Sequence, residues 1–296
     1  MSGGQKYVAK PRYLVYTDSS DVPQIVGETT PLPVTNRATS SYTGDFMLDI
    51  PAGNITGVSS VNKFGRNTSV ATSANETVWD GSTIYAATPG FPTSAVITHA
   101  WSAVDSAATQ GLTIEVQGLD ENWAAATDTV TLDGTNSTTA VAFDNATTMI
   151  RVFRMKVIDS TAADQLVRCG DSGKANYYAQ IQIDENQTQM AIYTVPANKT
   201  AYMTKYYASL NKAGGGGDPD GVLKMYTYDR ANNYTYQLKH TLGLDANANS
   251  QIEHDFKPYF KITEKTDIEM YFKNDSGTAT ADVSAGFDLI VVDDGY

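Results

Sequence analysis

Residues 268 to 273 read Ile-Glu-Met-Tyr-Phe-Lys, and this stretch indicates what kind of fold the chain adopts. Its alternation is the period-2 pattern of a strand with one buried face, which Ile268, Met270 and Phe272 would share. No long amphipathic helix accompanies it, so the sequence predicts an all-β protein. Similar strand-like runs occur at 112–116, 127–132, 150–158, 200–210, 222–228, 234–239 and 287–292.

Turn-forming residues separate these runs. They are Asp80-Gly81, Asp133-Gly134, Asp220-Gly221 and the Asn-Asp-Ser-Gly of residues 274–277. Many short strands with turns between them are typical of antiparallel sandwiches. The 296 residues suit roughly two ordinary domains. We therefore expect two tandem antiparallel β-sandwich domains, jelly-roll-like.

The composition changes along the chain and suggests where the domains meet. Thirteen of the 18 tyrosines lie after residue 170, whereas residues 100–150 are rich in Ala and Thr. These shifts predict a first sandwich over 45–165, a connection over 166–186 and a second sandwich over 187–296.

Residues 1–44 read as an extended arm outside any sheet, because prolines interrupt them and little alternation is present. Their apolar residues are too interrupted for an independent core and too numerous for a solvated tail. A short extended run in this arm is suited to join a sheet edge on a partner, and basic residues precede it. The candidate partner-binding residues are Lys10, Arg12, Tyr13, Leu14, Val15 and Tyr16.

The charge excludes some partners. With 21 basic and 33 acidic residues, the net charge is −12 and the pI about 4.6. Neither a nucleic-acid backbone nor an anionic membrane surface attracts such a chain. No run approaches the ~20 apolar residues of a membrane span, and the first residues lack the apolar core of a secretory signal. We expect a soluble protein made in a cytoplasm.

Residues 168–174, Arg-Cys-Gly-Asp-Ser-Gly-Lys, contain the Gly-Asp-Ser-Gly that surrounds the nucleophile of trypsin-like proteases. A serine nucleophile needs a histidine base, and the only upstream candidate, His99, lacks the family's surroundings and lies only 73 residues before Ser172. Lys174 replaces the family's second glycine. Cys169, the only cysteine, has no disulfide partner. We interpret the motif as an interdomain turn.

Acidic loops offer a second candidate site. Residues 245–249 open like a calcium loop, but Ser250 and Phe256 stand where an EF-hand needs Gly and Glu. An irregular calcium site from Asp218 and Asp220, or from residues 245–249, stays open beside the alternative of solvated loops.

Other candidate sites are weaker. The glycines of residues 214–217 lack the Lys and helix of a phosphate cradle and predict a hairpin tip. His240 and His254 have no evident third metal ligand and read as ordinary strand histidines. We expect no cofactor, no metal and no enzymatic activity; a polysaccharide-cleaving enzyme is a distant alternative.

Several short motifs stand out along the chain. They are Asn-Lys-Phe-Gly-Arg-Asn at 62–67, Val-Trp-Asp-Gly at 78–81, residues 117–123, 189–200 and 287–293, and Pro-Leu-Pro-Val-Thr at 31–35. Gly65 in the first of these motifs is expected to free the backbone where a chain bends out of a strand. Together the motifs resemble a recurrent family of virion structural proteins of tailed bacteriophages, especially marine ones. The likeness covers most of residues 45–296 and part of the arm.

The resemblance implies a virion component, and two hypotheses follow. In the first, the protein is a capsid decoration (cement) protein or head fibre that binds the major capsid protein or another virion protein as a homo-oligomer, with a trimer favoured. In the second, it is a receptor-binding, tail-fibre or neck module that contacts host glycans through exposed Tyr and Trp. The absence of a coiled-coil or β-helical shaft favours the capsid. Trp79 and Trp123 are expected to anchor the first core rather than stack on sugars.

Overall fold

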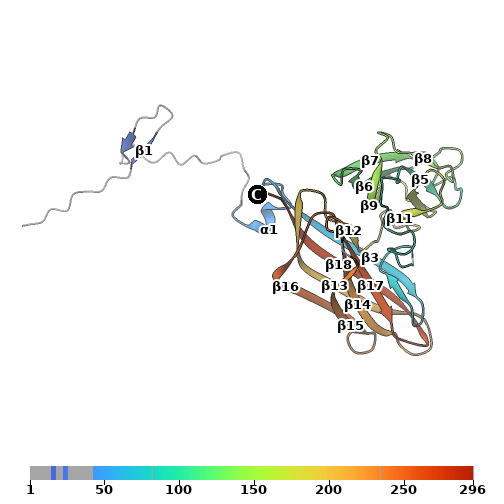
Figure 1. Cartoon of the computed structure of the whole chain (residues 1–296). Helices are drawn as coiled ribbons and strands as arrows, with labels where there is room; N and C mark the ends of the chain where they lie inside the picture. Colours follow the sequence, from blue (N-terminus) through green and yellow to red (C-terminus); the bar gives the residue numbers. More distant parts are fainter. Residues whose placement is uncertain (1–14, 18–22, 26–42, 82, 234, 296) are drawn as a thin grey trace, which may run out of the picture. The chain divides into compact units, whose positions relative to one another are not determined.

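The computed structural model describes residues 15–17, 23–25, 43–81, 83–233 and 235–295. The described residues form eighteen strands and one four-residue helix, and every strand pair is antiparallel (Figure 1). The prediction of an all-β fold of antiparallel sandwiches is confirmed. In the described part of the chain, no helix has the length and apolar character needed to cross a membrane.

Within the arm, two short strands pair with each other. They are β1 (Val15–Thr17) and β2 (Pro23–Ile25). The expectation that no part of the arm belongs to a sheet was therefore wrong. Pro23 opens β2, a position where its missing N–H is tolerated. Val15 and Tyr16 belong to β1. Lys10, Arg12, Tyr13 and Leu14 lie outside the described residues.

A single helical turn, α1 (Phe46–Asp49), follows the arm. The Asp45 side chain caps it by accepting the N–H of Met47 at 2.9 Å. The buried Asp49 carboxylate accepts the N–H of Thr43 at 2.9 Å and the Asn54 amide at 2.9 Å. This segment leaves Phe46, Met47 and Leu48 exposed in a row.

The larger of the two sandwiches, here called the C-terminal sandwich, consists of residues 55–78 and 191–296. One of its sheets has the order β16-β13-β18-β3; the other has the order β12-β17-β14-β15, and β4 also pairs with β17. The strands are β3 (Val58–Val70), β4 (Asn75–Thr77), β12 (Ile192–Thr194), β13 (Lys199–Gly215), β14 (Asp220–Asp229), β15 (Gln237–Asp245), β16 (Gln251–Ile262), β17 (Thr266–Asn274) and β18 (Ala279–Asp293).

Residues 79–190 form the second one, here called the inserted sandwich. Its sheets have the orders β11-β10-β5-β8 and β7-β6-β9. The strands are β5 (His99–Ser102), β6 (Thr113–Asp120), β7 (Ala125–Thr131), β8 (Val141–Ala142), β9 (Met149–Val157), β10 (Val167–Gly170) and β11 (Tyr177–Ile181).

These pairings correct the predicted domain boundaries. Figure 1 shows β3, coloured blue, among the orange and red strands of the C-terminal sandwich, and its register runs from Val58 opposite Val292 to Val70 opposite Ala281. Much of the expected first sandwich, from 45 to 78, therefore lies outside the inserted sandwich. The expected connection over 166–186 instead contains β10 and β11. Alternation identifies a strand but not its partner, so the tandem order expected over 45–165 and 187–296 was wrong.

Each sandwich has its own apolar core. Ile268, Met270, Phe272 and Phe287 are fully buried in the C-terminal sandwich, as predicted. Trp79 is 1% exposed in the core of the inserted sandwich, which confirms its expected packing role. Trp123 is only half-buried and lies under the guanidinium of Arg151, so its expected role in the core was wrong.

The chain crosses between the sandwiches twice, and the two crossings pair with each other. Trp79 and Met190 form an isolated β-bridge, and the N–H of Ala191 donates to the Val78 carbonyl at 2.9 Å. Gly65 of β3 packs on this pair, and a Cβ there would come within 2.3 Å of Ala191 N and Val78 O. Close backbone approach, rather than the expected bend in the chain, requires this glycine.

A buried ionic cluster also joins the two sandwiches. Arg151 of β9 pairs with Asp267 of β17 through two bonds, of 2.7 and 3.0 Å. Asp267 also accepts from Arg230 at 2.9 Å and from the Thr194 hydroxyl at 2.6 Å. The remaining Arg151 nitrogen donates to the Pro92 carbonyl at 2.6 Å. The inserted sandwich is thus held by paired, hydrogen-bonded charges as well as by the crossings.

Candidate interaction surface

The Gly-Asp-Ser-Gly motif forms a hairpin turn between β10 and β11, inside the inserted sandwich and not between domains as expected. The Asp171 carboxylate accepts the N–H groups of Ala175 and Asn176 at 3.2 and 2.9 Å. His99 lies opposite Gly170 in the β5–β10 ladder, nearer than the sequence suggested, and its Nδ1 bonds to the Thr98 hydroxyl at 2.7 Å. Among the described residues, no hydrogen bond joins His99 to Ser172.

We therefore expect Ser172→Ala to change neither the folding nor any activity of the protein, because a turn serine without a bonded base is no nucleophile. Intact wild-type protein should not react with a fluorophosphonate probe. A mutant of the neighbouring exposed turn residue, Lys174→Ala, serves as a control. Labelling of wild type and of the control that disappears in Ser172→Ala would contradict this interpretation.

The acidic loops are closed by their own hydrogen bonds. Asn247 donates its backbone N–H to Asp245 at 2.8 Å and its side-chain amide to Asp218 at 2.7 Å. In the parts of the chain that the structure describes, no group of three His, Cys, Asp or Glu side chains is placed to hold a metal ion. The glycines of residues 214–217 lie at the hairpin between β13 and β14, with Gly215 and Gly217 at positive φ.

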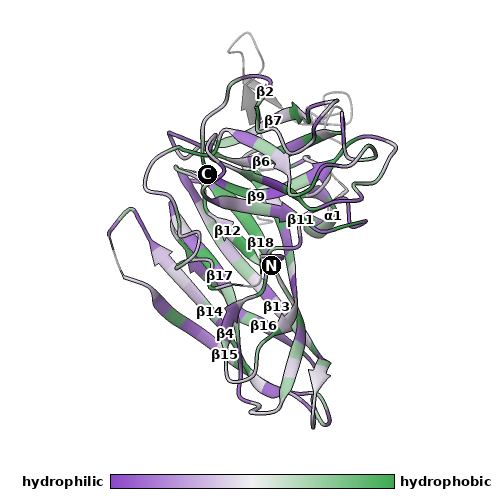
Figure 2. Ribbon diagram, turned by 90° about the vertical axis from the view of Figure 1, so that its right-hand side faces the viewer, coloured by the Kyte–Doolittle hydropathy of each residue, from purple (hydrophilic) through white to green (hydrophobic). Residues whose placement is uncertain are grey.

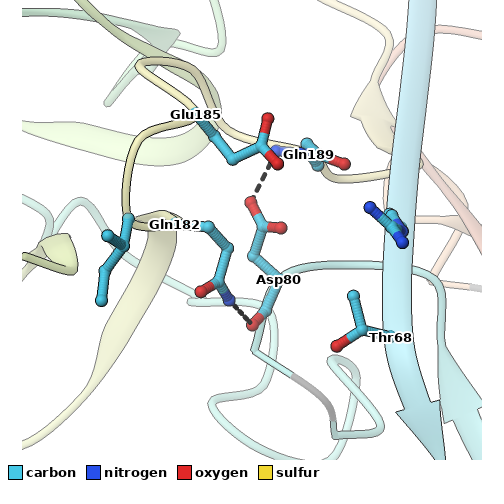
Figure 3. Close-up of a pocket in the computed structure, with 7 residues that line it drawn as sticks. Thr68, Asp80, Gln182, Glu185 and Gln189 are labelled. Carbon is cyan, nitrogen blue, oxygen red and sulfur yellow. Dashed lines mark hydrogen bonds between the residues drawn. The ribbon is translucent and has the colours of Figure 1, made fainter. Parts of the chain in front are cut away.

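A polar pocket of about 230 Å³ lies beside the crossings, and Figure 3 shows Asp80 at its centre. The Asp80 carboxylate accepts the backbone N–H of Gln189 at 2.6 Å, while its carbonyl accepts the Gln182 amide at 2.9 Å. Burial raises the pKa of Asp80 to about 8, and the nearby Glu185 adds to the rise. Arg66 lines the same pocket, but its guanidinium is paired in bidentate fashion with Asp282.

The pocket is best explained as part of the joint between the sandwiches. Asp80 lies on the outgoing crossing and Gln189 on the returning one, so the carboxyl ties the two segments together. A carboxyl with a raised pKa in a cleft is a candidate acid, but the Asp80 carboxylate accepts its hydrogen bond from the returning crossing at Gln189, and the Asp80 carbonyl accepts from Gln180 and Gln182 of the inserted sandwich. Sequence analysis interpreted residues 80 and 81 as a simple turn and gave no signal for this pocket.

The two histidines that sequence analysis set apart come together. His240 of β15 and His254 of β16 stack with their ring centroids 4.3 Å apart. The Tyr206 hydroxyl bonds to His240, and the Phe256 ring packs edge-on against His254 at 4.8 Å. Burial and the neighbouring His254 lower the pKa of His240. The stack fills the space between the two sheets where their last strands approach each other.

This side of the C-terminal sandwich, defined by β15 and β16, is here called the open edge. Both strands end their sheets, and each pairs with one neighbour only among the described strands. At the opposite ends of the two sheets lie β12 and β3, and Gly65 of β3 packs against the crossings at Val78 and Ala191. Figure 2 shows hydrophobic and hydrophilic residues mixed along both strands. Leu238 and Tyr259 are half-exposed there. The outer edges of two long strands, whose N–H and C=O groups pair with no other described strand, are a template for association with another chain.

Two hollows flank the open edge. The first, of about 190 Å³, is lined by residues of β14, β15 and β16, including Gln237, Lys239 and Phe260. The second, of about 480 Å³, lies on the outer face of β13 and β16 and includes Tyr207 and Ile252. Residues of both end strands therefore line hollows beside the open edge.

A cluster of tyrosines covers the outer face of β14 beside the open edge. Tyr226 and Tyr236 stack with centroids 4.2 Å apart and an interplanar angle of 9°. Tyr228 packs on Tyr236, and Arg230 lies over the Tyr228 ring at 4.0 Å. Beneath them, Tyr271 lies beside the fully buried Glu269. The three upper rings are half-buried, so part of each faces solvent.

Comparison of the chain with protein-family models and with curated proteins finds no match. The case for a function therefore depends on the residues and surfaces described above.

Proposed function

We propose that the protein is a non-enzymatic structural component of a tailed-phage virion, a capsid decoration (cement) protein or head fibre that acts as a homo-oligomer, with a trimer favoured. The observation that supports this most directly is the open edge, where the nine-residue β15 and the twelve-residue β16 each have one side that pairs with no other described strand. Soluble proteins that act alone shorten or cover such edges. In a component that is assembled with copies of itself and with a shell, open strand edges can pair with the neighbouring chains.

The charged residues inside the molecule also suit a structural role. The Arg151–Asp267 pair and the Asp80 carboxyl are both committed to the joint between the sandwiches. Burial raises the pKa of Cys169 far above its ordinary value, which suppresses the reactive thiolate. The Arg151–Asp267 pair and Asp80 hold the two sandwiches in one arrangement, as a particle component requires.

A second candidate, a receptor-binding or neck module that contacts host glycans, is favoured by one observation. The rings of Tyr226, Tyr228 and Tyr236 lie together and are partly exposed, and clustered aromatic rings of this kind can pack against sugars. Trp79 does not contribute, because it is buried in the core. Binding of wild type, but not of Tyr228→Ala, to a glycan array would favour this candidate.

Deleting residues 1–16 tests the arm in the proposed role. We expect the truncated protein to keep a nearly unchanged melting temperature and to lose most of its incorporation into particles, because both cores lie after residue 55. Incorporation is measured by quantitative mass spectrometry of purified virions from cells that supply either version. A matched control replaces residues 1–16 with a Gly/Ser segment of equal length. Full incorporation of the truncated chain would show that the arm is not the anchor.

A further inference from the structure

We propose that the arm of one copy adds as a strand to the β15 edge of a neighbouring copy, so that the homo-oligomer is held by exchanged arms. This proposal deepens the proposed function and rests on it for the existence of the oligomer. The segment concerned is residues 13–17, of which Val15–Thr17 form β1, and the receiving strand is β15.

The β15 edge is suited to receive a strand. Its backbone pairs with β14 on one side, and on the other side no strand of the described chain pairs with it. It contains no proline and only one lysine, Lys239. Leu238 is half-exposed and Thr241 is exposed, so an added strand would cover apolar and β-branched side chains. A long edge with few charges and no proline has none of the usual protection against pairing.

The β16 edge carries that protection. Its register with β13 jumps from Phe260 to Asp255, so four residues bulge out of the ladder. Pro258 lies within the bulge and has no N–H to donate. Lys257 and Lys261 add positive charge beside it. Of the two strands at the open edge, β15 is therefore the one that can accept an added strand.

The arm complements this edge in pattern and in charge. Residues 13–17, Tyr-Leu-Val-Tyr-Thr, are all β-branched, aromatic or apolar and suit a strand. Residues 1–17 contain three basic residues and no acidic ones, whereas the rest of the chain has 18 basic and 33 acidic residues, a net charge of −15. At its far end β15 meets the acidic hairpins, where Asp220 pairs with Asp245. Basic residues before the added strand would be attracted to such a surface.

The chain between β1 and the C-terminal sandwich is long enough for exchange. Residues 18–54 separate β1 from the C-terminal sandwich, and 37 residues span at most about 120 Å when extended. In a closed ring, each copy then donates one arm and receives one, which satisfies every β15 edge by the same contact.

Cysteine cross-linking of mixed copies tests the proposal. Tyr16→Cys is placed in one full-length chain and Thr241→Cys in a second, differently tagged chain, and the two are mixed, allowed to exchange and treated with a short bis-maleimide. Cys169 is fully buried, so the wild-type chain gives the background. We expect a cross-linked product that carries both tags, at least ten times above the mixture with Glu253→Cys of β16, which is the matched control on the protected edge.

Each outcome is informative. A third chain that carries both Tyr16→Cys and Thr241→Cys distinguishes exchange from folding back. If this chain cross-links within itself while the mixture gives no product with both tags, the arm lies on its own β15. A product favouring Glu253→Cys would place the arm on β16. Either result overturns the proposal, as does the absence of any product. Proteins found in purified virions without the cross-link would overturn the exchange and leave the proposed function standing. A cross-link formed by a protein that is absent from virions would support the arm exchange and overturn the proposed function.

Discussion

Replacing Arg151 by Ala is expected to lower the free energy of unfolding by about 3–5 kcal/mol. The guanidinium and the Asp267 carboxylate are 3% and 1% exposed, and they are joined by two bonds across the joint between the sandwiches. Removing the cation leaves Asp267 buried with only the partly exposed Arg230 as a charged partner. The loss of the main charged partner of buried Asp267, together with the lost packing on Trp123, accounts for the size of the effect.

Urea unfolding followed by far-UV circular dichroism measures this loss. The matched control is Arg66→Ala, which removes a bidentate pair of similar geometry with Asp282, but one in which the arginine is 41% exposed. Arg66→Ala is expected to lower the free energy of unfolding by less than about 1 kcal/mol. Equal losses in the two variants would mean that burial of the Arg151 pair does not govern its contribution, and that the joint is held by the crossings alone.

The stability of the protein should pass through a minimum near pH 8. Burial raises the pKa of Glu269 and of Asp80 to about 8, from ordinary values of 4.5 and 3.8. Both carboxyls hold protons more strongly in the folded state, so stability falls as the pH rises from about 4 to 8. Burial lowers the pKa of Lys63 to about 7, from 10.5. The unfolded chain binds that proton more strongly, so the Lys63 contribution to stability grows from pH 7, and the net stability rises again once both carboxyls have ionised above about pH 8.

Two variants separate these contributions. Glu269→Gln removes the ionisation of a carboxyl whose Oε2 has no hydrogen-bond partner among the described residues, and it should raise stability at pH 9 by on the order of 2 kcal/mol with little change at pH 5. Lys63→Met should reduce the increase in the free energy of unfolding above pH 8, because the variant has no amine to titrate at this position. Glu121→Gln, an exposed carboxylate, is the control. A stability curve that rises steadily from pH 4 to 8 would contradict the assigned protonation of Glu269.

Sequence patterns predicted the strands better than their partners. The alternation at Ile268, Met270 and Phe272 correctly identified the buried face of β17, because a period of two depends only on local sequence. The pairing of β3 with β18 joins residues more than 200 positions apart. Nothing in the pattern of residues 58–70 distinguishes that partner from a neighbouring strand, so the tandem boundaries were wrong.

The candidate surface was harder to anticipate for the same reason. His240 and His254 lie on consecutive strands, which usually pair with each other, yet here each strand ends a different sheet and the rings meet across the core. An open edge is a property of the whole topology, because a strand is an edge only when no other strand takes its place. Lys10, Arg12, Tyr13 and Leu14 lie outside the described residues, so the partner-binding role of the arm stays a prediction.

Imaging of intact virions by single-particle electron cryomicroscopy, with this chain fitted to the density, tests the central claim most directly. The proposed function predicts density for the inserted and C-terminal sandwiches at regular, symmetry-related positions on the head. In each position, connected density should extend from the first described residues of the C-terminal sandwich towards the shell or a neighbouring copy. Purified virions in which neither the density nor the peptides of this chain are found would contradict it.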